Sequence, residues 1–182
     1  VGSRGLGDVY KRQIIFNTPK DVKGTATLTY THKIGPDDQW LFLPAVNRVK
    51  RISSSNKSGP FMGSEFSFED LASAELEKYS YKFIAEKDEF KIVEAYPVDE
   101  KSGYSKRVVY YNSKKNYRVE KVEFYDRKGD HLKTLRYEKF NLYKEKFWRA
   151  DVFIMKNHQT NKETVLEFSD WNFDVNFSRD DF

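Results

Sequence analysis

The chain has 182 residues, a formal net charge of +4 and no cysteine. This length suits one domain with a sizeable core, and no apolar run approaches the ~20 residues that a membrane-spanning helix needs. The absence of cysteine excludes disulfides, thiolate metal sites and cysteine catalysis within this sequence. The small, mixed charge argues against nucleic acid as a partner, because such binding needs a concentrated basic face.

The first segment has an unusual origin. Residues Asp8 to Gln13 read Asp-Val-Tyr-Lys-Arg-Gln, which is the translation of GAT GTG TAT AAG AGA CAG, a transposon end used to fragment DNA for sequencing. We interpret residues 1–13 as a disordered sequencing scar outside the fold; the alternative is a genuine disordered arm. One domain, truncated at its N-terminus, is then expected over residues 14–182, with any signal peptide lost.

Short alternating segments predict an antiparallel β-structure from residue 24 onward. Aromatic residues make up 16% of the chain, which is strand-forming composition. Turn residues separate the segments, so each strand is expected to pair with its neighbour. The predicted strands are 25–31, 40–43, 49–52, 79–85, 90–96, 106–112, 117–125, 132–143, 148–156 and 164–168.

Only residues 67–74 predict a helix, which Ser67 would cap and whose Phe68 and Leu71 would pack on the sheet. Glu69 and Asp70 are interpreted as charges that favour the helix start, in preference to an acid–base pair. The irregular stretch 53–65 precedes this helix, and loops of that length are uncommon unless they are functional.

The order of several motifs resembles the outer membrane lipoprotein-sorting (LolA-like) family. The resemblance covers residue 14 to the end and rests on 40–44, Arg48-Val49-Lys50-Arg51-Ile52, Phe61-Met62-Gly63-Ser64 and Phe68-Glu69-Asp70-Leu71, with Pro19, 23–26, 124–126 and Gly129. It implies a mainly β fold: a strongly curved antiparallel sheet, an open and incomplete β-barrel, with a short helix on its concave side. It also implies an apolar pocket for acyl chains, and places the family's N-terminal helix and first strands before residue 14.

The residues predicted to bind lipid are Trp40, Phe42, Phe61, Met62, Phe66, Phe68 and Leu71. Phe61 and Met62 lie between Gly59-Pro60 and Gly63 in a polar loop, which favours a mobile flap over the pocket. The alternative for each of these side chains is that it fills the core.

Two further groups keep two interpretations, and the histidines have one. Arg48 and Arg51, with Lys50, would contact lipid headgroups or an acidic partner, or form a solvated strand edge. Trp40, Trp148 and Trp171 are core anchors or interfacial contacts. The histidines His32, His131 and His158 are interpreted as solvated turn residues, since none has a metal-ligand spacing.

No catalytic motif, cofactor site or metal site is found in the sequence, so the protein is not expected to be an enzyme. The expected function is a periplasmic carrier that holds the acyl chains of a lipid or lipoprotein and receives them from an inner-membrane transporter. Such a carrier would be peripheral to the membrane. The alternative is a cell-envelope module that binds or senses a protein or peptide with the same fold.

Overall fold

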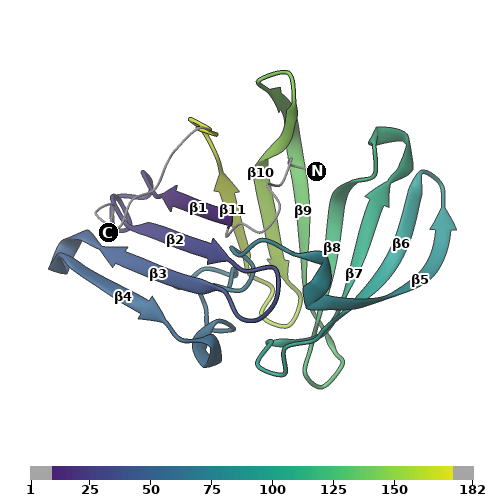
Figure 1. The fold of residues 1–182 in the computed structure, drawn as a ribbon, viewed down its shortest axis with the longest axis horizontal. Helices are drawn as coiled ribbons and strands as arrows, with labels where there is room; N and C mark the ends of the chain where they lie inside the picture. Colours follow the sequence, from purple (N-terminus) through teal and green to yellow (C-terminus); the bar gives the residue numbers. More distant parts are fainter. Residues whose placement is uncertain (1–9, 174–182) are drawn as a thin grey trace.

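The computed structural model describes residues 10–173, which form two antiparallel sheets (Figure 1). The smaller sheet has four strands in chain order: β1 (Tyr10–Ile15), β2 (Ala26–Thr31), β3 (Asp38–Leu43) and β4 (Arg48–Ile52). Leu41 and Ile52 lie on the face of this sheet that packs into the core, whereas Leu28, which pairs with Trp40, is buried on the opposite face.

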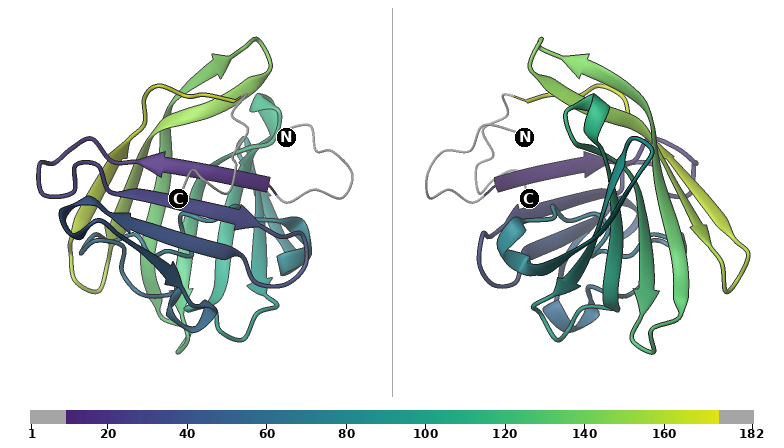
Figure 2. Two further views of the ribbon diagram at one scale, coloured as in Figure 1. Left: turned by 60° about the vertical axis from the view of Figure 1, so that its left-hand side comes forward. Right: turned by 90° about the vertical axis from the view of Figure 1, so that its right-hand side faces the viewer.

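The larger sheet is a seven-stranded meander in which each strand pairs with the next. Its strands are β5 (Tyr79–Lys87), β6 (Phe90–Pro97), β7 (Tyr104–Asn112), β8 (Arg118–Asp126), β9 (His131–Tyr143), β10 (Phe147–Asn157) and β11 (Glu163–Glu167). This sheet is strongly curved, and the strands of the smaller sheet cross it at a steep angle (Figure 2). The two sheets do not join, so the fold is open, as the sequence predicts.

Each of the ten predicted strands is confirmed, with ends that differ by one or two residues. The expectation that every strand pairs with its neighbour fails once. Strands β4 and β5 belong to different sheets, because the long segment 53–78 carries the chain from one sheet to the other.

The predicted helix over 67–74 is wrong. Residues 68–71 form consecutive turns, in which Asp70 N–H donates to Ser67 O (3.1 Å) and Ala72 N–H to Glu69 O (3.3 Å). Each of these hydrogen bonds joins a residue to the third residue before it, whereas an α-helix needs bonds to the fourth. The described residues contain four short 3₁₀ turns: η1 (Pro44–Val46), η2 (Ser54–Asn56), η3 (Leu76–Lys78) and η4 (Ser113–Lys115).

The core lies between the two sheets and is completed by the segment 53–78. Phe61, Phe66 and Leu71 from this segment are buried with Leu41 of β3 and Met155 of β10. Apolar burial of this kind is the main favourable term in folding. The segment is therefore part of the core that joins the sheets.

The structure also differs from the expectation that residues 1–13 lie outside the fold. Tyr10 to Gln13 belong to β1, where they pair with Thr31 to Leu28 of β2. Any sequence that tolerates an extended backbone can make such a ladder, because its hydrogen bonds join main-chain atoms. Residues 1–9 lie outside the described residues, and the origin of the segment as a sequencing scar stays a prediction.

Candidate functional site: a cavity with a buried arginine

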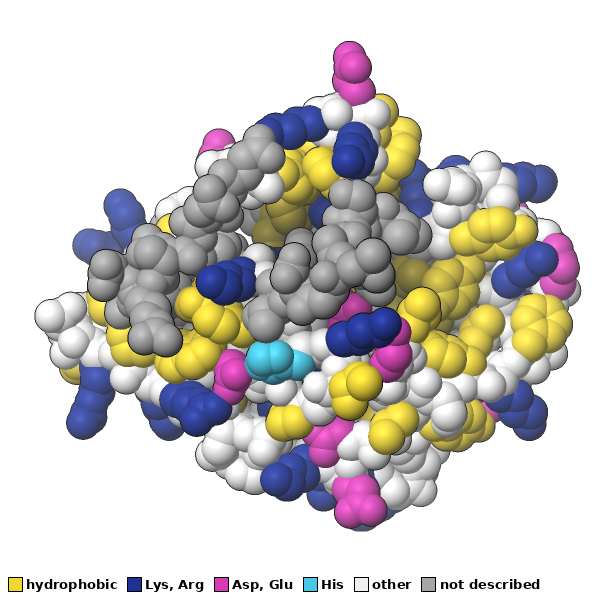
Figure 3. All heavy atoms as spheres, viewed as in Figure 1, with side chains coloured by type: hydrophobic (Ala, Val, Ile, Leu, Met, Phe, Trp, Pro, Cys, Tyr) yellow, Lys and Arg dark blue, Asp and Glu magenta, His cyan; other side chains and the backbone are white. Residues whose placement is uncertain are grey.

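A cavity of about 890 Å³ lies between the smaller sheet and the concave face of the larger one. Its walls come from β1, β2, β5 to β10 and the segment 70–76. The volume is within the range of small-molecule sites in proteins. Figure 3 shows hydrophobic side chains exposed on the β5 to β8 side of this face of the molecule.

Alternate residues of neighbouring strands make the apolar wall. On β7 the cavity-facing residues are Arg107, Val109 and Tyr111, which share one side of the strand because successive side chains point to opposite sides. The wall continues with Val122, Phe124, Leu135, Tyr137, Ala150 and Phe153 of the next three strands.

Tyr137 and Phe153 anchor this wall with an edge-to-face contact at 4.8 Å between ring centroids. Burial raises the pKa of Tyr137 to about 12. Its hydroxyl is therefore neutral at physiological pH, and the wall carries no charge at this position.

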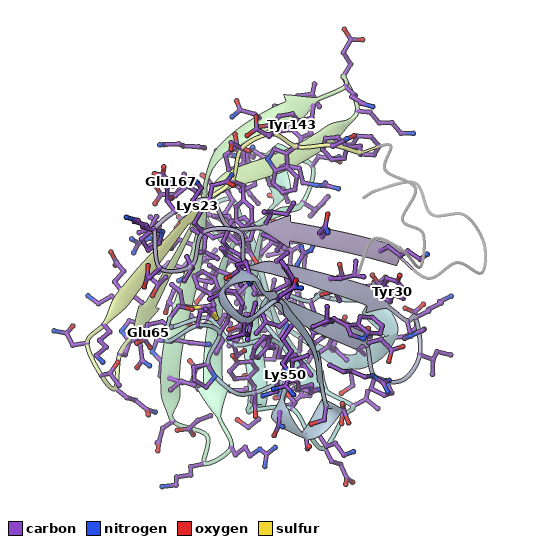
Figure 4. The ribbon with its side chains drawn as sticks, turned by 90° about the vertical axis from the view of Figure 1, so that its left-hand side faces the viewer. Lys23, Tyr30, Lys50, Glu65, Tyr143 and Glu167 are labelled. Carbon is purple, nitrogen blue, oxygen red and sulfur yellow. The ribbon has the colours of Figure 1, made fainter. Side chains whose placement is uncertain are left out.

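Aromatic side chains form a second part of the lining. Phe140, Trp148 and Trp171 line the cavity, and the Arg118 guanidinium lies 3.8 Å from the Phe140 ring centroid. Trp171 donates its indole N–H to Asp151 Oδ1 at 2.8 Å. Two of the tryptophans with open interpretations thus belong to the cavity. The nearby β9–β10 hairpin, marked by Tyr143 in Figure 4, extends beyond the smaller sheet.

Arg107 is a buried cation in the same wall, only 9% exposed. Three aromatic rings surround its guanidinium, with centroids at 4.9 Å (Tyr79), 5.3 Å (Tyr104) and 5.2 Å (Phe124). Its Nε and Nη2 atoms are buried without a hydrogen-bond partner. Nη2 lies 3.5 Å from Glu69 Oε1, an ion pair without a hydrogen bond.

Glu69 is itself held by the loop before β7. Ser102 Oγ donates to Oε1 at 2.5 Å, and the Gly103 N–H donates to Oε2 at 3.0 Å. The carboxylate is therefore satisfied by other donors and is shared only in part with Arg107.

Asp70 and Lys133 form a second buried pair, at 2.6 Å between Oδ2 and Nζ. Lys133 also donates to Glu65 O (2.9 Å), and the Tyr104 hydroxyl donates to Asp70 Oδ1 (2.7 Å). Burial, and the charge of Asp70, raise the pKa of Tyr104 well above its usual value. Glu69 and Asp70 thus tie the turns at 67–71 to the larger sheet, which corrects their interpretation as helix-start charges and explains why no helix forms.

The seven residues predicted to bind lipid do not line this cavity. Phe61, Phe66 and Leu71 are in the core, Phe68 is half-buried against them, and Trp40 and Phe42 are half-buried on β3. The structure brings Phe61 and Phe68 together, at 5.5 Å between ring centroids. The binding role of all seven stays a prediction.

The flap prediction needs a correction for Phe61. This side chain is 3% exposed and packs on Phe16 at 4.8 Å, so it lies in the core rather than over the cavity. Met62 is 39% exposed, with a φ of 48°. Glycine and proline around a large apolar residue mark a turn equally well when that residue points inward.

Arg48 and Arg51 lie exposed on β4, at the edge of the smaller sheet, and do not line the cavity. Arg51 forms an ion pair with Asp38 across the sheet. The arrangement is that of a charged strand edge, and contact with headgroups or a partner stays a prediction.

Two of the histidines are not isolated turn residues. The His131 and His158 rings lie 4.3 Å apart and both contact Thr134 Oγ1, at 3.1 Å and 2.8 Å. Desolvation, together with the nearby His131, lowers the pKa of His158. His32 contacts Asp38 at 2.9 Å. Within residues 10–173, no three His, Asp or Glu side chains gather as a metal site.

Sequence reasoning did not single out Arg107. A usable signal exists, because a charged residue at an otherwise apolar cavity-facing position of a strand breaks the alternation. In the predicted strand 106–112, Arg107 shares its side with Val109 and Tyr111. The sequence does not predict that the segment carrying Glu69 folds back and places this carboxylate next to Arg107.

Comparisons with known proteins agree with the fold. A family model described as an uncharacterized protein matches residues 9–182. No curated protein sequence matches the chain. Across residues 10–173, no helix has the length and apolar character that spanning a membrane requires.

Three solved structures are similar along most of the chain. A domain from Vibrio parahaemolyticus described as an outer membrane lipoprotein-sorting protein is 51% identical, with a TM-score of 0.87 over 98% of this chain and 77% of that one. A DUF1329 family protein from Desulfovibrio piger is 27% identical (TM-score 0.82; 92% and 72% covered). A LolA superfamily protein from Nitrosomonas europaea is 25% identical (TM-score 0.72; 96% and 79% covered).

Proposed function

Because the chain belongs to the outer membrane lipoprotein-sorting, LolA-like family, we propose that it is a carrier that holds the acyl chains of a lipid or lipoprotein in its cavity. The observation that carries this proposal is the cavity of about 890 Å³ with its apolar wall on β7 to β10. Each buried CH₂ contributes about 0.8 kcal/mol, so one long acyl chain contributes on the order of 10 kcal/mol before entropy costs.

We infer the cellular setting from the same family. The carrier works in the periplasm, peripheral to the membrane, and receives its cargo from an inner-membrane transporter. Holding and releasing an acyl chain needs no bond chemistry, so the proposed function is non-catalytic and needs no cofactor.

A second function, binding of a protein or peptide, has one observation in its favour. Strand β5 is an edge of the larger sheet and exposes Tyr81, Phe83 and Ile84, which are 44%, 59% and 45% accessible. An exposed apolar edge can accept an added strand. Binding of a peptide to an edge strand needs no cavity, so this second function leaves the cavity unexplained. The carrier function therefore remains the preferred proposal.

A cavity-blocking variant tests the carrier proposal. Val109→Trp places a large ring in the apolar wall, whereas Arg136→Trp, an exposed position on β9, is the matched control. The affinity for a fluorescent fatty acid should fall about tenfold or more in the first variant and stay unchanged in the second. Unfolding midpoints confirm that both variants fold, and equal affinities would contradict the proposal.

A further inference from the structure

We propose that Arg107 is an anion receptor inside the cavity, which binds a carboxylate or phosphate oxygen of the acyl ligand's head group. This inference rests on the proposed function, since it assumes an acyl ligand. It adds the chemical class of the cargo: an anionic amphiphile whose chain lies along the apolar wall.

The first support is the state of the guanidinium. Two of its nitrogens, Nε and Nη2, are buried without hydrogen-bond partners, and leaving a charged donor unsatisfied costs free energy. The neighbouring buried cation differs, because Lys133 Nζ contacts both Asp70 (2.6 Å) and Glu65 O (2.9 Å). The network therefore satisfies one cation and leaves two buried donors of the other unsatisfied, on a residue that lines the cavity.

The second support is that the surroundings fix Arg107 without satisfying it. The rings of Tyr79, Tyr104 and Phe124 hold the guanidinium by cation–π contacts. The Glu69 oxygens accept from Ser102 and Gly103. A guanidinium held in place this way loses little freedom when it binds a planar carboxylate or a phosphate, which favours affinity.

The third support is the charge of the lining as a whole. Its cations are Arg12, Lys33, Arg107, Arg118 and Arg149, and its carboxylates are Asp70 and Glu75. Asp70 is paired with Lys133, but Lys33 and Arg118 are likewise paired, with Glu77 and Glu120. With these three residues set aside, the lining still has more cations than carboxylates. A low-dielectric cavity lined mainly by one sign of charge attracts the opposite sign, so an anionic ligand fits this lining better than a neutral one.

The position of Arg107 also suits an amphiphile. Arg107 lines both the large cavity and a smaller one of about 330 Å³, so it lies where the two adjoin. Val109 and Tyr111 follow it on the same side of β7, at about 6–7 Å per two residues. A head group at Arg107 thus leaves the acyl chain in contact with the apolar wall.

The test compares three probes of equal chain length on the full chain: palmitate, hexadecyl phosphate and uncharged hexadecanol. The wild type should bind the better anion about tenfold or more tightly than the alcohol, as expected for a charged hydrogen bond. The anion that binds with the higher affinity identifies carboxylate or phosphate as the cargo's head group. Equal binding of the alcohol and both anions would overturn the inference and leave the carrier function standing, whereas no binding of any probe would overturn both.

Variants assign the preference to Arg107. Arg107→Gln should abolish it, so that this variant binds the anions no more tightly than hexadecanol, and the exposed Arg136→Gln should retain it. Glu69→Gln should increase the preference, because it removes the carboxylate that competes for Arg107. If Arg107→Gln does not fold, two other variants still test whether Arg107 causes the preference. These are Glu69→Gln and Arg107→Lys, which keeps the charge but not the planar fork of the guanidinium. A preference that none of these variants changes would show that Arg107 has only a structural role.

Discussion

At the scale of single residues, Phe61 and Met62 are neighbours in opposite environments: Phe61 is 3% exposed and Met62 is 39% exposed. Phe61→Ser should therefore lower the free energy of unfolding by about 3–5 kcal/mol, as large-to-small core substitutions do. Met62→Ser should change it by no more than about 0.5 kcal/mol. Urea denaturation of the two single variants measures both effects. Loss of acyl-probe affinity in Phe61→Ser with unchanged stability would instead restore the flap.

The candidate site was less predictable than the core, for a reason visible in Glu69 and Arg107. Both belong to recognisable local patterns, a polar turn and an alternating strand. Their ion pair joins positions far apart in the sequence, and only the path of the segment 53–78 brings them together. The sequence leaves Trp148 and Trp171 ambiguous for the same reason, because residues distant in the chain set their environment.

At the scale of elements, the turn between β9 and β10 places two non-glycine residues at positive φ, a backbone conformation that strains residues with a side chain. Lys144 and Glu145 have φ angles of 49° and 52°, and the Lys146 N–H donates to Tyr143 O at 3.0 Å. Two consecutive positive φ angles characterise a type I′ turn, which favours Asn-Gly.

Replacing one of these residues should stabilise the hairpin. Glu145→Gly removes the steric cost of a side chain at positive φ, so the free energy of unfolding should rise by about 1 kcal/mol. Glu138→Gly, at an exposed strand position of β9, should lower it instead, because glycine weakens a strand. Thermal melts of the two variants compare the effects. Destabilisation by both would show that the turn gains more from the Glu145 side chain than from a relaxed backbone.

The strands were predictable because their signals are local: alternation, aromatic residues and turn chemistry recur within each hairpin. The helix over 67–74 was not, although Ser67 does accept a hydrogen bond from the Asp70 N–H as a cap would. The competing interaction is tertiary, since Asp70 also binds Lys133 and Tyr104. For a segment of about two turns, helix propensity is too weak to outweigh such contacts.

At the scale of the whole molecule, the two sheets depend on each other, and β1 is the outer strand of the smaller one. Four of its six register pairs with β2 involve residues 10–13. Arg12 also contributes to the cavity lining. The boundary of the domain therefore affects both stability and the site.

A chain that begins at Ile14 should be less stable than one that begins at Tyr10, because it loses most of the β1–β2 ladder. These four pairs hold about four hydrogen bonds. At about 1 kcal/mol per hydrogen bond, the loss should be about 4 kcal/mol, or about 8–16 °C in melting temperature. Replacing residues 10–13 by four threonines is the control, since backbone pairing tolerates any strand-forming sequence. That variant should melt close to the longer chain. Equal melting temperatures of the chains that begin at Ile14 and at Tyr10 would show that residues 10–13 add nothing to the stability of the fold, as expected of a foreign segment.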